Sequence, residues 1–91
     1  MPLQWITLRE CDEAEGAAKG SAFRAFRRIE NAWSEARDFH VLHHDADRAE
    51  IDALREQQRI YASTVNLLLL SPTLATAVRA QMRRMITDPA E

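Results

Sequence analysis

The sequence predicts a helix-rich α+β fold, a winged helix-turn-helix-like domain with a short strand pair. Three observations predict it. A helix-turn-helix pattern occupies residues 7–29, and its second helix is rich in arginine. Two stretches rich in β-formers, residues 39–42 and residues 60–70, are suited to pair as strands. A chain of 91 residues without repeat or linker is expected to form one domain, residues 1–91.

The first helix is predicted to begin at a capping box, with Thr7 as N-cap and Glu10 three residues later. It runs to about Glu15 and stops at Gly16, a residue type favoured just after a helix end. After a short turn, Ser21 is expected to cap the next helix. The backbone amides of Gly20 and Ser21 would then be placed to meet a phosphate.

The second helix, residues 22–33, has two different faces. Because side chains three, four and seven residues apart share a helix face, its apolar face is Ala22, Phe26, Ile29 and Trp33, and its polar face is Arg24, Arg27, Arg28 and Asn31. Phe23 lies at the edge of the apolar face, and we expect it to pack in the core. The helix is expected to end between residues 33 and 37.

Strands and helices alternate in the remaining chain. The sequence predicts a strand over residues 39–42, a helix from Asp45 or Asp47 to about Gln57, and a second strand within residues 60–70. Ser71 and Pro72 form a typical helix start, and this last helix is expected to end before Asp88.

Residues 47–70 also allow a second interpretation. Their apolar and aromatic side chains follow a spacing of three and four residues, so the segment can be read as one long helix in an all-α bundle. We favour the strand because residues 60–65 are poor helix formers and because residues 39–42 need a pairing partner.

The first third of the chain resembles the excisionase-like and MerR-like helix-turn-helix regulators. The resemblance rests on a Thr that opens the first helix, a Glu three residues on, a Gly, a short turn, and then an aromatic residue and an Arg. These are Thr7, Glu10, Gly16, Ser21, Phe23 and Arg24. Asp12 and Glu15 depart from the family pattern, which usually has apolar residues there. The resemblance implies a DNA-binding domain of bacterial or phage-like type, with the second helix in the major groove.

The distribution of charge and the composition indicate which partners and which cellular compartment to expect. The net charge is −2, but basic residues concentrate in residues 19–37 and 79–84, while acids concentrate in residues 10–15 and 45–56. Arg24, Arg27, Arg28 and Asn31 are therefore expected to contact bases and phosphates, and Lys19 and Ser21 to hold phosphates at the turn. No signal peptide is visible, the longest apolar run is too short for a membrane span, and the lone Cys11 fits a reducing cytoplasm.

Other functions have weaker support. His40, His43, His44 and Asp45 lack a recognisable metal-ligand spacing, so we expect neither a metal nor another cofactor. No nucleophile and base form a recognisable pattern, so neither an enzyme nor a small-molecule substrate is expected. The main alternative is a protein-interaction module that uses the arginine face. Met82, Met85 and Ile86 either complete the core or border a homodimer interface.

Overall fold

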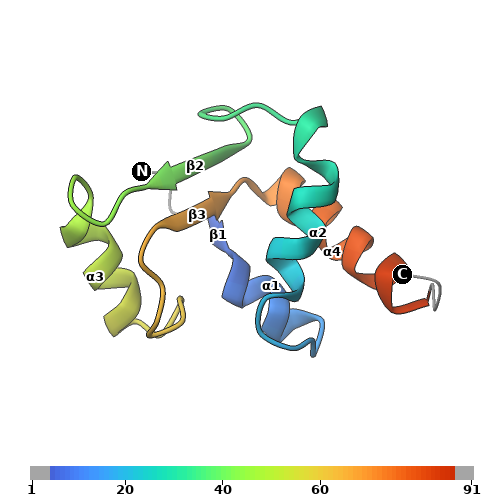
Figure 1. Ribbon diagram of the computed structural model, residues 1–91, viewed down its shortest axis with the longest axis horizontal. Helices are drawn as coiled ribbons and strands as arrows, with labels where there is room; N and C mark the ends of the chain where they lie inside the picture. Colours follow the sequence, from blue (N-terminus) through green and yellow to red (C-terminus); the bar gives the residue numbers. More distant parts are fainter. Residues whose placement is uncertain (1–4, 88–91) are drawn as a thin grey trace.

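The computed structural model describes residues 5–87 and shows an α+β fold of helices around a small antiparallel sheet (Figure 1). In chain order the elements are β1 (Ile6–Thr7), α1 (Leu8–Ala14), α2 (Ser21–Ile29), the 3-10 helix η1 (Glu30–Ala32), β2 (Phe39–Leu42), α3 (Arg48–Glu56), β3 (Leu67–Leu70) and α4 (Pro72–Thr87). The arrangement is winged-helix-like, as predicted. Helix α4 reaches Thr87, the last residue that the structure describes, so the expected helix end before Asp88 lies at the limit of the described residues.

The sheet confirms the predicted strand pair. Its order is β1-β3-β2, with β3 in the centre and antiparallel to both neighbours. Phe39 of β2 lies opposite Leu70 of β3, and Leu42 lies opposite Leu67. The alternative of one continuous helix over residues 47–70 is therefore wrong.

The second strand is shorter than the sequence suggested, because only Leu67–Leu70 of the stretch 60–70 is a strand. Gln58, with a φ of 60°, turns the chain back towards β1 and α1. There Arg59 donates hydrogen bonds to the Trp5 carbonyl (2.7 Å) and to Glu10 (2.9 Å), and its own carbonyl accepts from the Thr7 hydroxyl (2.5 Å). These bonds hold the segment before β3 in an irregular path.

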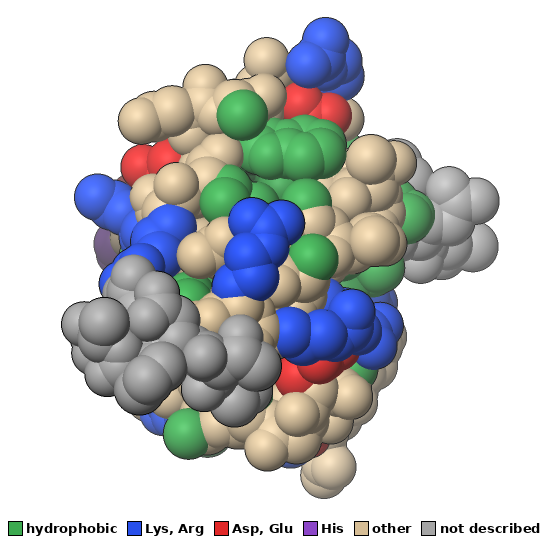
Figure 2. Space-filling model, turned by 90° about the vertical axis from the view of Figure 1, so that its right-hand side faces the viewer, with side chains coloured by type: hydrophobic (Ala, Val, Ile, Leu, Met, Phe, Trp, Pro, Cys, Tyr) green, Lys and Arg blue, Asp and Glu red, His purple; other side chains and the backbone are tan. Residues whose placement is uncertain are grey.

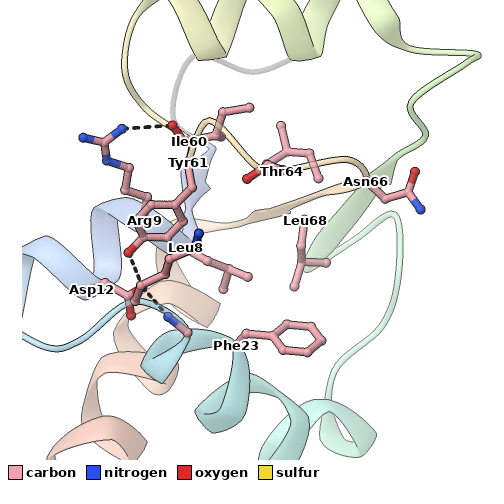
Figure 3. Close-up of a pocket in the computed structure, with 12 residues that line it drawn as sticks. Leu8, Arg9, Asp12, Phe23, Ile60, Tyr61, Thr64, Asn66 and Leu68 are labelled. Carbon is pink, nitrogen blue, oxygen red and sulfur yellow. Dashed lines mark hydrogen bonds between the residues drawn. The ribbon is translucent and has the colours of Figure 1, made fainter.

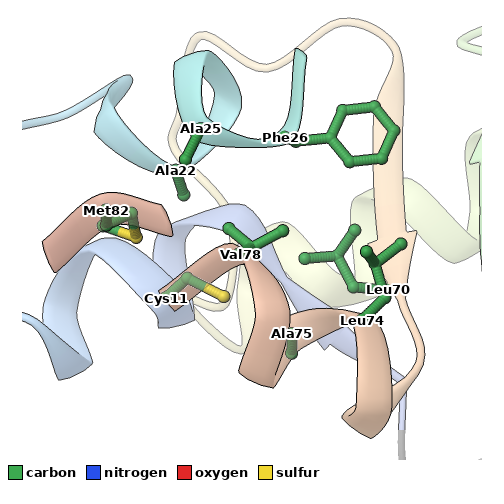
Figure 4. Packing of buried hydrophobic residues seen from close by; sticks show 9 residues of the cluster. All are labelled: Cys11, Ala22, Ala25, Phe26, Leu70, Leu74, Ala75, Val78 and Met82. Atoms are coloured by element: carbon green, nitrogen blue, oxygen red, sulfur yellow. The ribbon is translucent and has the colours of Figure 1, made fainter. Parts of the chain in front are cut away.

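Two apolar clusters lie on the two sides of β3. Successive side chains of a strand point to opposite faces of its sheet. Leu70 accordingly packs with the cluster formed by α1, α2 and α4 (Figure 4), whereas Leu67 and Leu69 pack with α3. In the first cluster the ring of Phe26 meets that of Phe39 edge to face, with centroids 5.2 Å apart. This contact fixes α2 against the sheet.

The predicted N-cap is present at the start of α1 but not at the start of α2. The capping box of α1 is present, since Thr7 accepts from the Glu10 amide (3.1 Å) and Glu10 accepts from the Thr7 amide (2.9 Å). Gly16 follows the end of α1 with a φ of 61°, as expected. The N-cap of α2, however, is Gly20 with a φ of 95°, and not Ser21, which is already helical.

Candidate nucleic-acid interface

The second helix of the helix-turn-helix presents the two faces that its sequence predicts. Ala22 and Phe26 are buried, and Phe26 is only 3% exposed. Arg24, Arg27 and Arg28 are exposed on the other side of α2. Asn31, which follows them in η1, is also exposed. All four predicted residues are therefore exposed, on α2 or directly after it.

Asp12 fixes the start of this helix. Its carboxylate is 1% exposed and accepts hydrogen bonds from the amides of Ala22 (2.7 Å) and Gly20 (3.2 Å). It also accepts from the Tyr61 hydroxyl (2.6 Å), which lies in the loop before β3. Asp12 is therefore an N-cap supplied from a neighbouring helix, and it does what Ser21 was expected to do.

This arrangement corrects the expected phosphate site at the turn. The Gly20 amide is bonded to Asp12, and the Ser21 amide donates to the Ala18 carbonyl (3.1 Å). Neither amide is left over for a ligand. A phosphate near this turn would have to be held by side chains instead.

Lys19 is exposed at the turn but has contacts of its own. Its ammonium donates to the Ser63 hydroxyl (2.7 Å) and lies 5.0 Å from the centroid of the Tyr61 ring. The guanidinium of Arg9 lies 5.5 Å from the same centroid. Two cations thus flank Tyr61. Burial, and after it the hydrogen bond that the Tyr61 hydroxyl donates to Asp12, raises the pKa of Tyr61 to about 12.

The glutamates of and just after α1 are each paired with arginine. Arg9 forms a salt bridge with Glu13 (3.2 Å), and Arg59 forms one with Glu10 (2.9 Å). Glu15 forms salt bridges with both Arg79 (2.6 Å) and Arg83 (2.8 Å) of α4. Hydrogen bonds from Arg83 and Arg79 hold the pKa of Glu15 below its ordinary value. The negative charge beside α2 is therefore largely compensated locally, and Glu15, which departs from the family pattern, ties α1 to α4.

A groove of about 450 Å³ lies between α2 and the second half of α4. Its lining includes the predicted residues Ser21, Arg24 and Arg28, together with Met82 and Met85. Met82 is buried, as the core interpretation requires, whereas Met85 is only half-buried; the side chain of Ile86 is outside the described part. Figure 2, which faces this end of the molecule, shows groups of basic side chains around exposed hydrophobic surface.

Phe23 is not in the core, contrary to expectation. Its side chain is 47% exposed, beside a hollow of about 200 Å³ that is lined mainly by α1, the loop before β3 and the start of β3 (Figure 3). The helical spacing explains this outcome. The buried stripe of α2 follows Ala22, Ala25 and Phe26, and Phe23 lies about a quarter turn outside it.

The histidines do not form a recognisable metal site. His43 is exposed, and the backbone amide of His44 donates to the Asn66 side chain (3.0 Å). His40 meets the Trp5 ring edge to face, with centroids 5.9 Å apart. Within residues 5–87, no three His, Cys, Asp or Glu side chains are grouped as metal ligands.

Comparisons with known proteins add no relative. No protein-family model matches the chain, and neither the curated proteins nor the solved structures contain a significant match. In the described part of the chain, no helix is long and apolar enough to cross a bilayer. Functional inference therefore rests on the geometry of α2 and its surroundings.

Proposed function

We propose that this chain binds duplex DNA through the outer face of α2, as a small cytoplasmic regulator or excisionase-type accessory factor. The observation that supports it most is the second helix of a helix-turn-helix, buried through Phe26 on one side and lined by Arg24, Arg27 and Arg28 on the other. A helix held in this way fits a major groove, and guanidinium groups suit both guanine and phosphate.

The local charge supports this proposal despite the net charge of −2. Among the described residues Arg24 has no carboxylate partner, and the glutamates of and just after α1 already have arginine partners. The acidic helix α3 packs on the other side of the sheet, away from α2 (Figure 1). DNA approaching α2 would therefore meet mainly positive charge.

A titration of labelled duplex DNA with the full chain tests the proposal. We expect random-sequence duplex to bind at low salt, and Arg24→Glu to weaken that binding about tenfold or more. Arg48→Glu is the matched control, because Arg48 is exposed on α3 and carries the same charge change. Absence of binding by the wild type, or equal effects of both substitutions, would contradict the proposal.

A second candidate function is docking of a protein segment in the groove between α2 and α4. Met82 and Met85 give this groove apolar surface, and Arg24 and Arg28 line its rim. Such a groove suits a helix that carries both apolar and acidic side chains. Binding of acidic, leucine-containing peptides that is lost in Met85→Lys, in a protein that binds no DNA, would favour this candidate.

A further inference from the structure

Phe23 is an apolar side chain that the fold leaves outside the core. The other apolar residues of α2 are fully or largely buried, whereas Phe23 is 47% exposed. It borders the hollow lined by α1, the loop before β3 and the start of β3, and Figure 3 shows its ring on the opposite side of that hollow from Leu68. A single exposed apolar side chain is common on protein surfaces, so the place of Phe23 in the helix-turn-helix has to indicate its role.

The position of Phe23 along α2 matters as much as its exposure. In the first turn of α2, Ala22 is buried and Ser21 is half-buried, so Phe23 and Arg24 are the two side chains that project outward. In a helix-turn-helix the N-terminal residues of the second helix are those that reach base edges. The two outward side chains are therefore placed where sequence would be read.

The start of α2 is also held rigidly. Asp12 binds the amides of Gly20 and Ala22, which flank Ser21, and Tyr61 in turn donates to Asp12 at 2.6 Å. The backbone that carries Phe23 is thus tied both to α1 and to the loop before β3. A side chain held on such a backbone can discriminate between base pairs, because it does not have to be ordered on binding.

We propose that Phe23 contacts the methyl group of a thymine while Arg24 binds a neighbouring guanine, so that the preferred site contains guanine within one or two base pairs of thymine. Thymine is the base that presents a methyl group in the major groove, and guanine presents two acceptors that match a guanidinium. Adjacent Cα atoms are about 3.8 Å apart, close to the spacing of about 3.4 Å between base pairs. This inference rests on the proposed DNA-binding function.

The test removes the methyl group without changing the protein. A duplex selected from a random pool by the full chain is remade with each thymine replaced in turn by uracil, which lacks only that methyl. We expect one or two positions at which the replacement weakens binding about fourfold, the effect of losing one buried methyl group. At those positions Phe23→Ala should bind the thymine and uracil duplexes equally well.

Two further variants make the result specific. Val65→Ala truncates the other large hydrophobic side chain that is exposed among the described residues, at 59%, and should keep the preference for thymine. Arg24→Ala should lose the preference for guanine and keep the preference for thymine. Thermal unfolding of Phe23→Ala should match the wild type, since truncation of an exposed side chain removes little packing.

The failures of the two proposals are distinguishable. Equal binding of thymine and uracil duplexes by the wild type would overturn the assignment of Phe23 and leave DNA binding intact. A preference for thymine that survives in Phe23→Ala would overturn the assignment in the same way. Absence of any duplex binding by the wild type would overturn both.

Discussion

At the scale of single residues, Asp12 links three parts of the helix-turn-helix. One carboxylate oxygen accepts from the Ala22 amide, and the other accepts from the Gly20 amide and the Tyr61 hydroxyl. The Asp12→Asn variant keeps the shape but supplies one acceptor oxygen in place of two. We expect it to lower the free energy of unfolding by about 2–4 kcal/mol, because a buried donor loses its partner.

Urea unfolding measures this effect, and Asp52→Asn is its control. Asp52 is 54% exposed on α3 and pairs with Arg48 and Arg55 at the surface, so its substitution should change stability by less than about 0.5 kcal/mol. Equal stability of Asp12→Asn and the wild type would show that the cap is not needed.

Tyr61 makes the stability depend on alkaline pH. Burial and the bond to Asp12 raise its pKa from 10.0 to about 12, so the folded protein favours the protonated phenol. This contribution is complete below pH 10 and is lost as the pH rises towards 12. Burial likewise raises the pKa of Cys11 from 9.0 to about 11, so stability should begin to fall above pH 9.

The midpoint of urea unfolding, measured at intervals of about one pH unit from pH 8 upward, tests this dependence. Tyr61→Phe should flatten the fall between pH 10 and 12 and leave the fall caused by Cys11. Ultraviolet absorbance follows the phenolate directly, because the chain contains 1 Tyr. Ionisation of Tyr61 at its ordinary pKa of 10.0 in the folded protein would contradict the role assigned to its bond.

The hydrogen bonds between residues close in sequence could be predicted from the sequence, whereas those between residues far apart in sequence could not. The capping box of Thr7 and Glu10 spans three residues and is readable from spacing alone. Tyr61 lies 49 residues from Asp12, and no spacing rule connects them. The exposure of Phe23 could have been predicted from the sequence, since Phe23 lies outside the helical stripe formed by Ala22, Ala25 and Phe26.

At the scale of elements, we propose that one face of α2 serves folding and the other serves DNA recognition. Arg24→Ala and Arg27→Ala should each change stability by less than about 0.5 kcal/mol, because both side chains are exposed. Each should weaken binding to a preferred duplex by about 1–3 kcal/mol if it reads a base edge. Phe26→Ala should cost about 3–5 kcal/mol of stability, because it empties the space beside Phe39.

Thermal unfolding and duplex titration of these variants measure both effects in parallel. Phe26→Ala should reduce binding only as far as it unfolds the domain, so lowering the temperature should restore its affinity. Unfolding of the domain by the arginine substitutions would assign this face to the core. Unchanged affinity for preferred DNA in both arginine variants would remove α2 from the interface.

The strands show where prediction from sequence ends. The bounds Phe39–Leu42 could be predicted because they depend on a local β-rich run, and so could the pairing with the later stretch. The start of β3 at Leu67 could not, because bonds from Arg59 to Trp5 and Glu10 fix the preceding loop. Those bonds depend on the folded positions of β1 and α1.

At the scale of the whole molecule, charge is distributed unevenly. Helices α2 and α4, which carry arginines, lie towards one end in Figure 1, and α3, which carries acidic residues, lies towards the other. The charge concentrations in residues 19–37, 79–84 and 45–56 of the sequence predict this asymmetry. The pairing of Glu15 with Arg79 and Arg83 cannot be predicted from those concentrations, and it reduces the net positive charge at the surface of α4.

This distribution predicts weak and strongly salt-dependent DNA binding. With about three to five phosphate contacts, the logarithm of the affinity should fall with the logarithm of salt concentration with a slope of about −3 to −5 per protomer. Titrations of random duplex over a range of salt concentrations measure the slope. Arg28→Ala should reduce the magnitude of this slope by about one, whereas Arg48→Ala on α3 should leave the slope unchanged. A slope near zero would indicate that bound phosphates do not drive association.

The central claim is that the outer face of α2 is the DNA interface, and amide chemical shifts test it most directly. An isotope-labelled full chain is titrated with short duplex DNA at low salt, and the shift changes are assigned residue by residue. We predict that the largest changes fall on residues 19–31, with smaller changes on residues 79–84 and none on Arg48–Glu56 of α3. Changes centred on α3, or the absence of any change, would contradict the claim.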